Sequence, residues 1–426
     1  MLRVLMCTVL LSSIHAASRN TYKGWKLYRY WSPEHLVRDL STLYENTENF
    51  DFWSVIREAG EPVDVAVREI AHPSFENILE KLNVSYQVQI EYIDKAFNRE
   101  VKEMKAASNP EKGHINFEKY HRYNVILDYV KNLEKKHPGR VSIESIGKSV
   151  EEREIFVVKI SSKTQSLKPA ILVDAGLSPR EWIGPAQALY IIQQFVENPY
   201  YKKMVENVDW YIIPVVNPDG YEYTHTKERL WKKNRAKNNN HTGVYLNRNF
   251  DINFGGDLSS SAEEAWNYHG KSAFSEPETE AIRRFIENNV LRIKLYLSLD
   301  SFGPAIVYPY GYKEDPPENI EIIKLVAENV AEQIRKENQT PYQVKRASSR
   351  HCKYSGTSVD WSVEVAGVPF AFTVELTTPG YLGFDFPTYR IKTVVQEFMT
   401  GLKVFYDFIN DNFVIKSIKD APKIEL

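Results

Sequence analysis

The sequence has very little cysteine for its length, and after its first residues it has no long apolar run. Only Cys7 and Cys352 occur among 426 residues, which excludes a disulfide framework of the kind that holds small secreted domains together. Beyond the first seventeen residues, no stretch reaches the roughly 20 apolar residues of a transmembrane helix. The formal net charge is only -2, which argues against nucleic acid or an anionic membrane as the main partner.

The first seventeen residues have the pattern of a secretory signal peptide. Arg3 gives a positive start, Leu5 to Leu11 is a short apolar run, and His15-Ala16-Ala17 offers small residues for cleavage. The alternative is a buried N-terminal strand. We therefore expect residues 1–17 to be removed and the protein to be extracellular and secreted. Three N-glycosylation sequons agree with that route, at Asn83, Asn240 and Asn338.

The next part of the chain predicts a small α+β domain. Strand patterns and two helix patterns alternate over Trp25 to Trp31, Pro33 to Tyr44, Phe50 to Ile56, Val63 to Val67, Pro73 to Leu82 and Tyr86 to Ile93. The order β-α-β-β-α-β is typical of a ferredoxin-like sandwich, with helices on one face of an antiparallel sheet. Residues 96–115 then turn strongly polar, with almost nothing to bury. They predict an exposed linker open to a trypsin-like protease, or a solvated connecting helix.

From Phe117 onward, long helices alternate with near-continuous apolar strands. The strand patterns lie at Ile155 to Ile160, Ala170 to Leu177, Asp209 to Val216, Leu295 to Leu299 and Phe370 to Leu376. Such strands suit a sheet that is buried on both faces. Ser275 and Glu278 predict a capping box at a helix start, and a last helix is predicted over Tyr389 to Ile409. Residues 116–426 are therefore predicted to be α/β, with a mixed central β-sheet flanked by helices.

Six short segments stand in a fixed order along the chain. They are Pro179-Arg180-Glu181-Trp182-Ile183, Asn217-Pro218-Asp219-Gly220-Tyr221, Asn247-Arg248-Asn249-Phe250, Tyr308-Pro309-Tyr310-Gly311-Tyr312, Ser358-Val359-Asp360-Trp361 and Phe372-Thr373-Val374-Glu375-Leu376. Together they resemble the zinc metallocarboxypeptidases of the digestive A/B type, from the propeptide to the last helix. The resemblance implies an activation propeptide at 18–95, a linker at 96–115 and a carboxypeptidase-like domain at 116–426. It also implies that the propeptide covers the substrate groove.

The resemblance places the family's zinc ligands at three positions. In this family, zinc is held by His-x-x-Glu and a later His, with an open position where the metal activates water. Here Ser178 and Asp300 stand at the histidine positions, and only Glu181 is retained. Serine is not a usual zinc ligand, and two carboxylates without imidazole make a poor zinc site, so we expect no bound cofactor. Calcium or magnesium would suit two carboxylates better, although those ions usually need more oxygens.

Other residues near the expected metal agree with its loss. Tyr245 stands where the family has a carboxylate that orients the first histidine. The resemblance places no histidine at a ligand position; the nearest candidates to consider are His225, His269, and the adjacent His351 and Cys352.

The catalytic positions are only partly retained. Glu375 matches the family's general acid/base glutamate, whose alternative role is a structural ion pair. Lys232 matches the arginine that stabilises the transition state, and lysine keeps the charge but loses the planar fork. The mobile-loop tyrosine aligns with Cys352, or with Tyr354 if a two-residue gap is allowed.

The residues that grip substrate are retained. Asn247 and Arg248 match the pair that binds a peptide's C-terminal carboxylate by charge-assisted hydrogen bonds. Arg180 lies along the substrate groove in the family. Val359 stands at the position that sets the depth of the side-chain pocket, and its apolar side chain implies aliphatic or aromatic C-terminal residues. The alternative is that these residues only hold the fold.

Three hypotheses follow from this pattern. The first is a secreted pseudo-peptidase that binds the C-termini of peptides or proteins without cleaving them. The second is an active A-type zinc carboxypeptidase whose metal site is rebuilt from Glu181, Asp300 and water. The third is a protein that acts through its surface, as a partner or regulator of active relatives.

Overall fold

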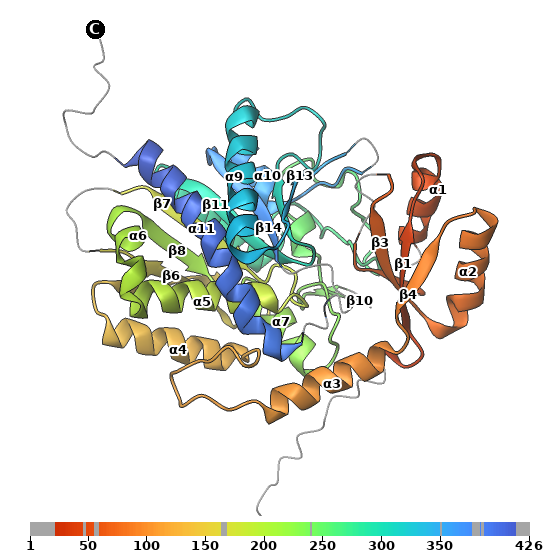
Figure 1. Cartoon of the computed structure of the whole chain (residues 1–426), viewed down its shortest axis with the longest axis horizontal. Coiled ribbons are helices and arrows are strands. Elements are labelled where there is room, and N and C mark those ends of the chain that lie inside the picture. The colour runs from red at the N-terminus through yellow and green to blue at the C-terminus, as the bar shows by residue number, and fades with distance from the viewer. Residues whose placement is uncertain are drawn as a thin grey trace, which may run out of the picture.

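The computed structural model places the chain in two units that a helix connects (Figure 1). It describes residues 22–45, 48–54, 59–162, 168–238, 241–349, 352–376, 384 and 387–414. A small unit in red and orange lies beside a larger unit, and α3 (Ile93–Ala106) runs from one to the other. The predicted signal peptide lies outside the described residues.

The small unit is a four-stranded antiparallel sheet with helices on one face. Its order is β2-β3-β1-β4, the order of a ferredoxin-like sandwich. The elements are β1 (Lys26–Trp31), α1 (Val37–Ser41), β2 (Phe50–Phe52), β3 (Pro62–Val67), α2 (His72–Lys81) and β4 (Tyr86–Ile90). The predicted element order is confirmed.

Alternation along β1 separates two contact surfaces of the small unit. Tyr28 and Tyr30 are fully buried and pack against Phe75 of α2. Leu27 points to the opposite face and joins a cluster that includes Leu230 of the large unit. The sheet therefore packs on its own helices with one face and on the large unit with the other.

The prediction of an exposed linker over residues 96–115 is wrong for its first part. Residues 93–106 form helix α3, in which Ile93, Phe97 and Glu100 recur at helical spacing and are buried. Glu100 pairs with Arg229 of the large unit at 2.8 Å, and both side chains are at most 1% exposed. The polar composition of this segment did not reveal the buried helix face, because one residue of that face is Glu100, a carboxylate whose partner Arg229 is distant in the sequence.

The large unit is built on one mixed eight-stranded sheet of order β13-β12-β14-β11-β7-β8-β6-β5. Pairs from β14 through β11 and β7 to β8 are parallel, whereas β5-β6, β6-β8 and β12-β14 are antiparallel. The strands are β5 (Val141–Lys148), β6 (Glu154–Ile160), β7 (Ala170–Ala175), β8 (Asp209–Ile213), β11 (Ile293–Ser301), β12 (Ala305–Tyr308), β13 (Gln343–Arg346) and β14 (Phe370–Leu376). The predicted mixed central sheet is confirmed.

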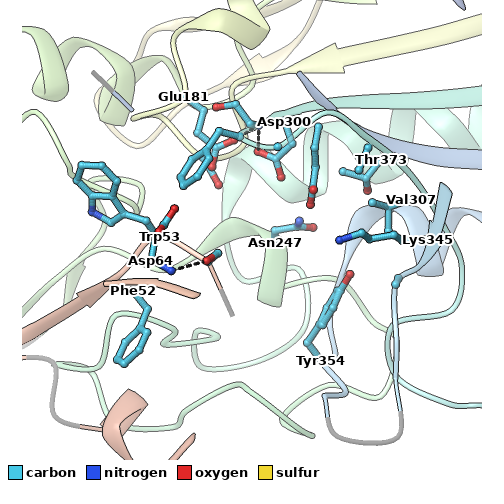
Figure 2. A pocket seen from close by; sticks show the side chains of 18 of the residues that line it. Phe52, Trp53, Asp64, Glu181, Asn247, Asp300, Val307, Lys345, Tyr354 and Thr373 are labelled. Atoms are coloured by element: carbon cyan, nitrogen blue, oxygen red, sulfur yellow. Dashed lines mark hydrogen bonds between the residues drawn. The ribbon is translucent and has the colours of Figure 1, made fainter. Parts of the chain in front are cut away.

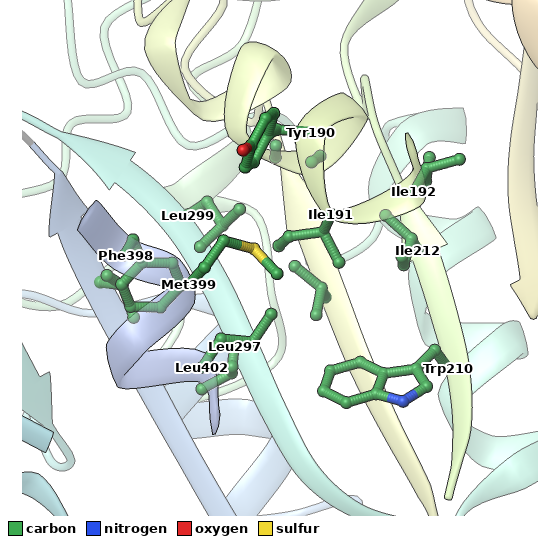
Figure 3. Packing of buried hydrophobic residues seen from close by; sticks show 14 of the residues in the cluster. Tyr190, Ile191, Ile192, Trp210, Ile212, Leu297, Leu299, Phe398, Met399 and Leu402 are labelled. Atoms are coloured by element: carbon green, nitrogen blue, oxygen red, sulfur yellow. The ribbon is translucent and has the colours of Figure 1, made fainter. Parts of the chain in front are cut away.

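Helices cover both faces of this sheet. One face is covered by α4 (Tyr123–Lys136), α5 (Ile183–Glu197), the short α6 (Lys202–Asn207), α9 (Ile320–Asn338) and α11 (Ile391–Phe413), and the other by α8 (Pro277–Asn289) and α10 (Ser358–Glu364). Figure 3 shows the first face, where Ile191 of α5, Leu297 of β11 and Met399 of α11 meet. The near-continuous apolar strands reflect this double burial.

The predicted capping box at the start of α8 is wrong. The N-cap residue is Glu276, and no side chain caps it. Glu278 is fully buried and accepts a hydrogen bond from Asn234 at 3.0 Å instead of reaching back to Ser275. Ser275 donates to the carboxylate of Glu276. A buried amide partner therefore determines the orientation of Glu278.

Two sequon asparagines, Asn83 and Asn338, lie at the surface, whereas Asn240 falls outside the described residues. Within the ranges given above, no helix combines the length and apolar character needed to cross a bilayer.

Replacing Glu100 with alanine leaves Arg229 buried without its carboxylate. We predict that Glu100→Ala lowers the free energy of unfolding by about 3–5 kcal/mol, because breaking a buried ion pair leaves an uncompensated charge. Urea unfolding checks this. The control is Asn98→Ala at an exposed position of the same helix, which should change the free energy of unfolding by less than ~1 kcal/mol. Equal effects of the two variants would contradict the prediction.

Candidate functional site

The candidate site lies where three parallel strands end at the same edge of the large sheet. In the register of β11, Asp300 stands opposite Glu375 of β14, and Leu299 stands opposite Ala175, the last residue of β7. Ser178 follows three residues after that strand end. Sites in open α/β sheets form at the carboxyl ends of strands, so the register alone brings Ser178, Asp300 and Glu375 to one edge.

A cavity of about 630 Å³ opens at this edge and is lined by both units. All nine site residues predicted from the sequence line it: Ser178, Arg180, Glu181, Lys232, Asn247, Arg248, Asp300, Val359 and Glu375. Figure 2 shows Trp53 and Asp64 of the small unit facing Glu181, Asp300 and Asn247 of the large unit. The small unit therefore forms part of the cavity wall.

The residues at the three expected metal positions have hydrogen-bond partners of their own. Ser178 Oγ lies 3.4 Å from the hydroxyl of Tyr245. The backbone N–H of Ser301 donates to Glu181 Oε2 at 2.6 Å and to Asp300 Oδ1 at 3.2 Å. Among the described residues, no group of three or more His, Cys, Asp and Glu side chains could hold a metal ion. A serine hydroxyl and two carboxylates do not fit zinc, because protein zinc sites draw most of their ligands from His and Cys.

The histidines considered in the sequence have other contacts. The His225 ring stacks on Trp182 at a centroid distance of 3.9 Å, and His269 Nδ1 lies 2.8 Å from the carbonyl oxygen of Gly270. Neither lines the cavity at the strand ends. His351 is outside the described residues.

Arg248 is held firmly at the cavity wall. Its Nη1 donates to the carbonyl of Asn247 at 2.6 Å and its Nε to the carbonyl of Leu258 at 3.0 Å. Arg248 is 6% exposed, and within the described ranges no carboxylate lies at ion-pair distance from it. The Asn247 side chain is fixed too, because its Oδ1 accepts from the N–H of Ser358 at 3.0 Å.

Val359 and Asp360, at the start of α10, both line the cavity. The Val359 side chain is buried, and Asp360 Oδ2 accepts from the N–H of Gly311 at 2.8 Å. Burial raises the pKa of Asp360 to about 7. Val359 thus contributes an apolar side chain to the cavity wall.

Tyr354, and not Cys352, lines the cavity. Figure 2 shows its ring on the side opposite Glu181 and Asp300, and its centroid lies 5.1 Å from the guanidinium of Arg248. A Cβ at Gly311 would come within 2.7 Å of this ring, so glycine is needed there. Of the two alternatives left by the sequence, Tyr354 is the one that lines the cavity beside Arg248.

Sequence reasoning missed Asp51 of β2, which binds two cations of the groove. Arg180 Nη1 donates to both Asp51 oxygens, at 3.1 and 3.0 Å, and Lys232 Nζ lies 2.8 Å from Oδ1. The carbonyl of Phe52 accepts from Lys232 at 2.9 Å. Arg180 and Lys232 therefore line a part of the cavity that the small unit covers. The sequence pattern that could have identified Asp51 is the alternation Phe50-Asp51-Phe52, because it points the aspartate away from the core of the small unit.

Charge and burial oppose one another in this cluster. Burial alone would raise the pKa of Asp51, but Arg180 and Lys232 outweigh it and hold that pKa below its usual range. Burial, followed by repulsion from Arg180, lowers the pKa of Lys232 to about 8, even though Asp51 opposes the shift. Asp51 therefore offsets only part of the cost of burying Lys232 as a cation beside Arg180.

Further contacts hold the small unit over the cavity. Glu61 pairs with Lys345 of β13, and the Trp53 ring packs against Phe302 and Phe384 at centroid distances of 6.3 and 5.2 Å. The cover therefore combines ion pairs with an aromatic contact.

Comparison with known families gives two matches. A family model described as zinc carboxypeptidase matches residues 126–401. A model described as carboxypeptidase activation peptide matches residues 33–100. The second match ends inside α3, in agreement with the packing of that helix.

Individual relatives match nearly the whole chain. Carboxypeptidase A2 of Rattus norvegicus is 33% identical over 389 residues, which cover 89% of this chain and 92% of the relative. Carboxypeptidase B of Rattus norvegicus is 30% identical over 423 residues, or 96% and 99% of the two chains. The solved structure of carboxypeptidase A from Helicoverpa armigera has a TM-score of 0.86 and 31% identity, and covers 92% of this chain and 99% of its own.

Removing the carboxylate of Asp51 should loosen the cover. We predict that Asp51→Ala lowers the free energy of unfolding by about 3 kcal/mol, because Arg180 and Lys232 are left together without a carboxylate. Hydrogen exchange of β2 amides should also become faster than in the wild-type chain. The control is Asp39→Ala at an exposed position of the small unit. An equal loss of stability in both variants would show that the contact of Asp51 with Arg180 and Lys232 does not hold the cover.

The lowered lysine pKa values predict a pH dependence of stability. Burial lowers the pKa of both Lys232 and Lys233 to about 8, so above this pH the unfolded chain binds more protons than the folded one. Stability should therefore rise between about pH 8 and 9.5, by on the order of 2 kcal/mol per lysine. Urea unfolding across this interval should show the rise halved in Lys232→Met and unchanged in the exposed control Lys227→Met. A flat profile in the wild-type chain would contradict the prediction.

Proposed function

We propose that this chain, which belongs to the zinc carboxypeptidase family and carries that family's activation peptide, binds the C-terminal carboxylate of peptides without hydrolysing them. The observation that carries this proposal is the contrast between two ends of one cavity. Arg248 and Asn247 are retained and firmly held, whereas the positions expected to hold zinc carry Ser178, Glu181 and Asp300. We also propose that the protein is secreted, as residues 1–17 predict.

The case against hydrolysis is chemical. The family's reaction needs a metal that lowers the pKa of water and polarises the scissile carbonyl. Without it, Glu375 has no activated water from which to take a proton. Lys232, at the position of the transition-state cation, is already engaged by Asp51 and Phe52. Fold and family membership alone do not supply these groups.

The case for binding rests on Arg248. A buried guanidinium that is oriented by two backbone carbonyls keeps its remaining edge for a carboxylate, which it can bind by charge-assisted hydrogen bonds. Tyr354 lies beside it and can cover such a ligand. Because Val359 lines the adjacent wall, the C-terminal residue should be aliphatic or aromatic.

Calorimetry with an acetylated dipeptide that ends in leucine tests this proposal on the full chain. The free acid should bind, and its C-terminal amide should bind at least about tenfold more weakly, because the amide has no negative charge for Arg248. Arg248→Ala should lose this discrimination, whereas Arg284→Ala, at an exposed arginine, should keep it. Equal binding of acid and amide to the wild-type chain would show that the groove is not used. Release of leucine from the free acid would show that the protein is an active carboxypeptidase.

A further inference from the structure

Apart from the ion pairs of Arg29, Arg180, Lys232 and Lys345 and the buried carboxyl of Asp360, the charged side chains that line the cavity fall into two groups. Three carboxylates, on Glu181, Asp300 and Glu375, come from the strand-end edge of the large sheet. Arg248 lies with Tyr354 at another part of the wall. Figure 2 shows Asn247 between Tyr354 and the pair of Glu181 and Asp300. A ligand beside Asn247 therefore meets negative side chains in one direction and the arginine in the other.

The other cations of the cavity wall are already paired. Arg180 and Lys232 bind Asp51, Arg29 binds Asp64, and Lys345 binds Glu61. Arg248 differs, since within the described residues its hydrogen bonds go to carbonyl oxygens. An entering carboxylate would therefore be bound by Arg248.

The three carboxylates favour a cationic group of a ligand, whereas a zinc ion would favour the carbonyl oxygen of a peptide. Asp300 stands in register with Glu375, and Asp300 and Glu181 accept from the same N–H of Ser301, so the three carboxylates are neighbours. Together they oppose a neutral peptide carbonyl and attract a compact cation. An ammonium group has three donors and one positive charge, which suit carboxylate acceptors. A peptide bound through its C-terminal carboxylate has an amide nitrogen at this place, and that nitrogen carries no charge.

We infer that the preferred ligand of the cavity is a free α-amino acid with an apolar side chain, its carboxylate on Arg248 and Asn247 and its ammonium group toward Glu375, Asp300 and Glu181. This inference rests on the proposed function and narrows its ligand. The cavity of about 630 Å³ has ample room for such a molecule while the small unit stays in place. Cleavage of the connecting segment is then not required for binding.

The test compares L-leucine, N-acetyl-L-leucine and L-leucinamide by calorimetry on the full chain. L-leucine should bind at least about tenfold more tightly than either derivative, because each derivative lacks one charged hydrogen-bonding group. Glu375→Gln should lower the affinity for L-leucine by about tenfold and leave that for N-acetyl-L-leucine unchanged. Asp300→Asn is a second variant with the same expected result, and Glu364→Gln, on the outer part of α10, is the control.

The outcomes separate this inference from the proposal on which it rests. If N-acetyl-L-leucine binds as tightly as L-leucine and leucinamide does not bind, the ammonium site is wrong and the carboxylate clamp stands. If leucinamide binds as tightly as L-leucine, the clamp at Arg248 is wrong as well. Absence of binding by all three compounds overturns the amino-acid ligand, while the acetylated dipeptide still tests the clamp.

Discussion

The parallel pairing of β11 with β7 and β14 determines where chemistry can occur in this protein. It aligns Asp300 with Glu375 and brings Ser178 to the same edge, although these residues are far apart in the sequence. Helices on both faces bury the strands almost completely, so this register cannot slip without exposing the core. The fold thus presents a family site whether or not the residues in it support the family's reaction.

The second constraint is the cover over that site. Asp51 gives one carboxylate to two cations that would otherwise face the groove, and Glu100 neutralises Arg229 where α3 enters the large unit. Both contacts are buried ion pairs, which stabilise an interface mainly because separation leaves uncompensated charge. The small unit is therefore part of the folded structure around the cavity. In this protein, residues of the small unit and of the large unit together line the cavity.

Much of this could be predicted from the sequence, because it follows from local patterns. The strand order of the small unit and the buried strands of the large one came from apolar periodicity, and the site residues came from a family resemblance. What failed depends on partners that are distant in the sequence. Glu278 is turned inward by Asn234, Glu100 is buried by Arg229, and Asp51 finds its cations across the interface. The choice of Tyr354 needed the packing of its ring against Gly311.

We propose that a carboxypeptidase fold here encloses a binding site without a catalytic metal. Zinc can be counted per chain by mass spectrometry on the full chain, after dialysis has removed loosely held metal. We expect a value near zero, because serine and two carboxylates do not form a zinc site. About one zinc per chain would contradict it, and would mean that Glu181 and Asp300 bind metal with further ligands and that the protein is to be treated as a peptidase.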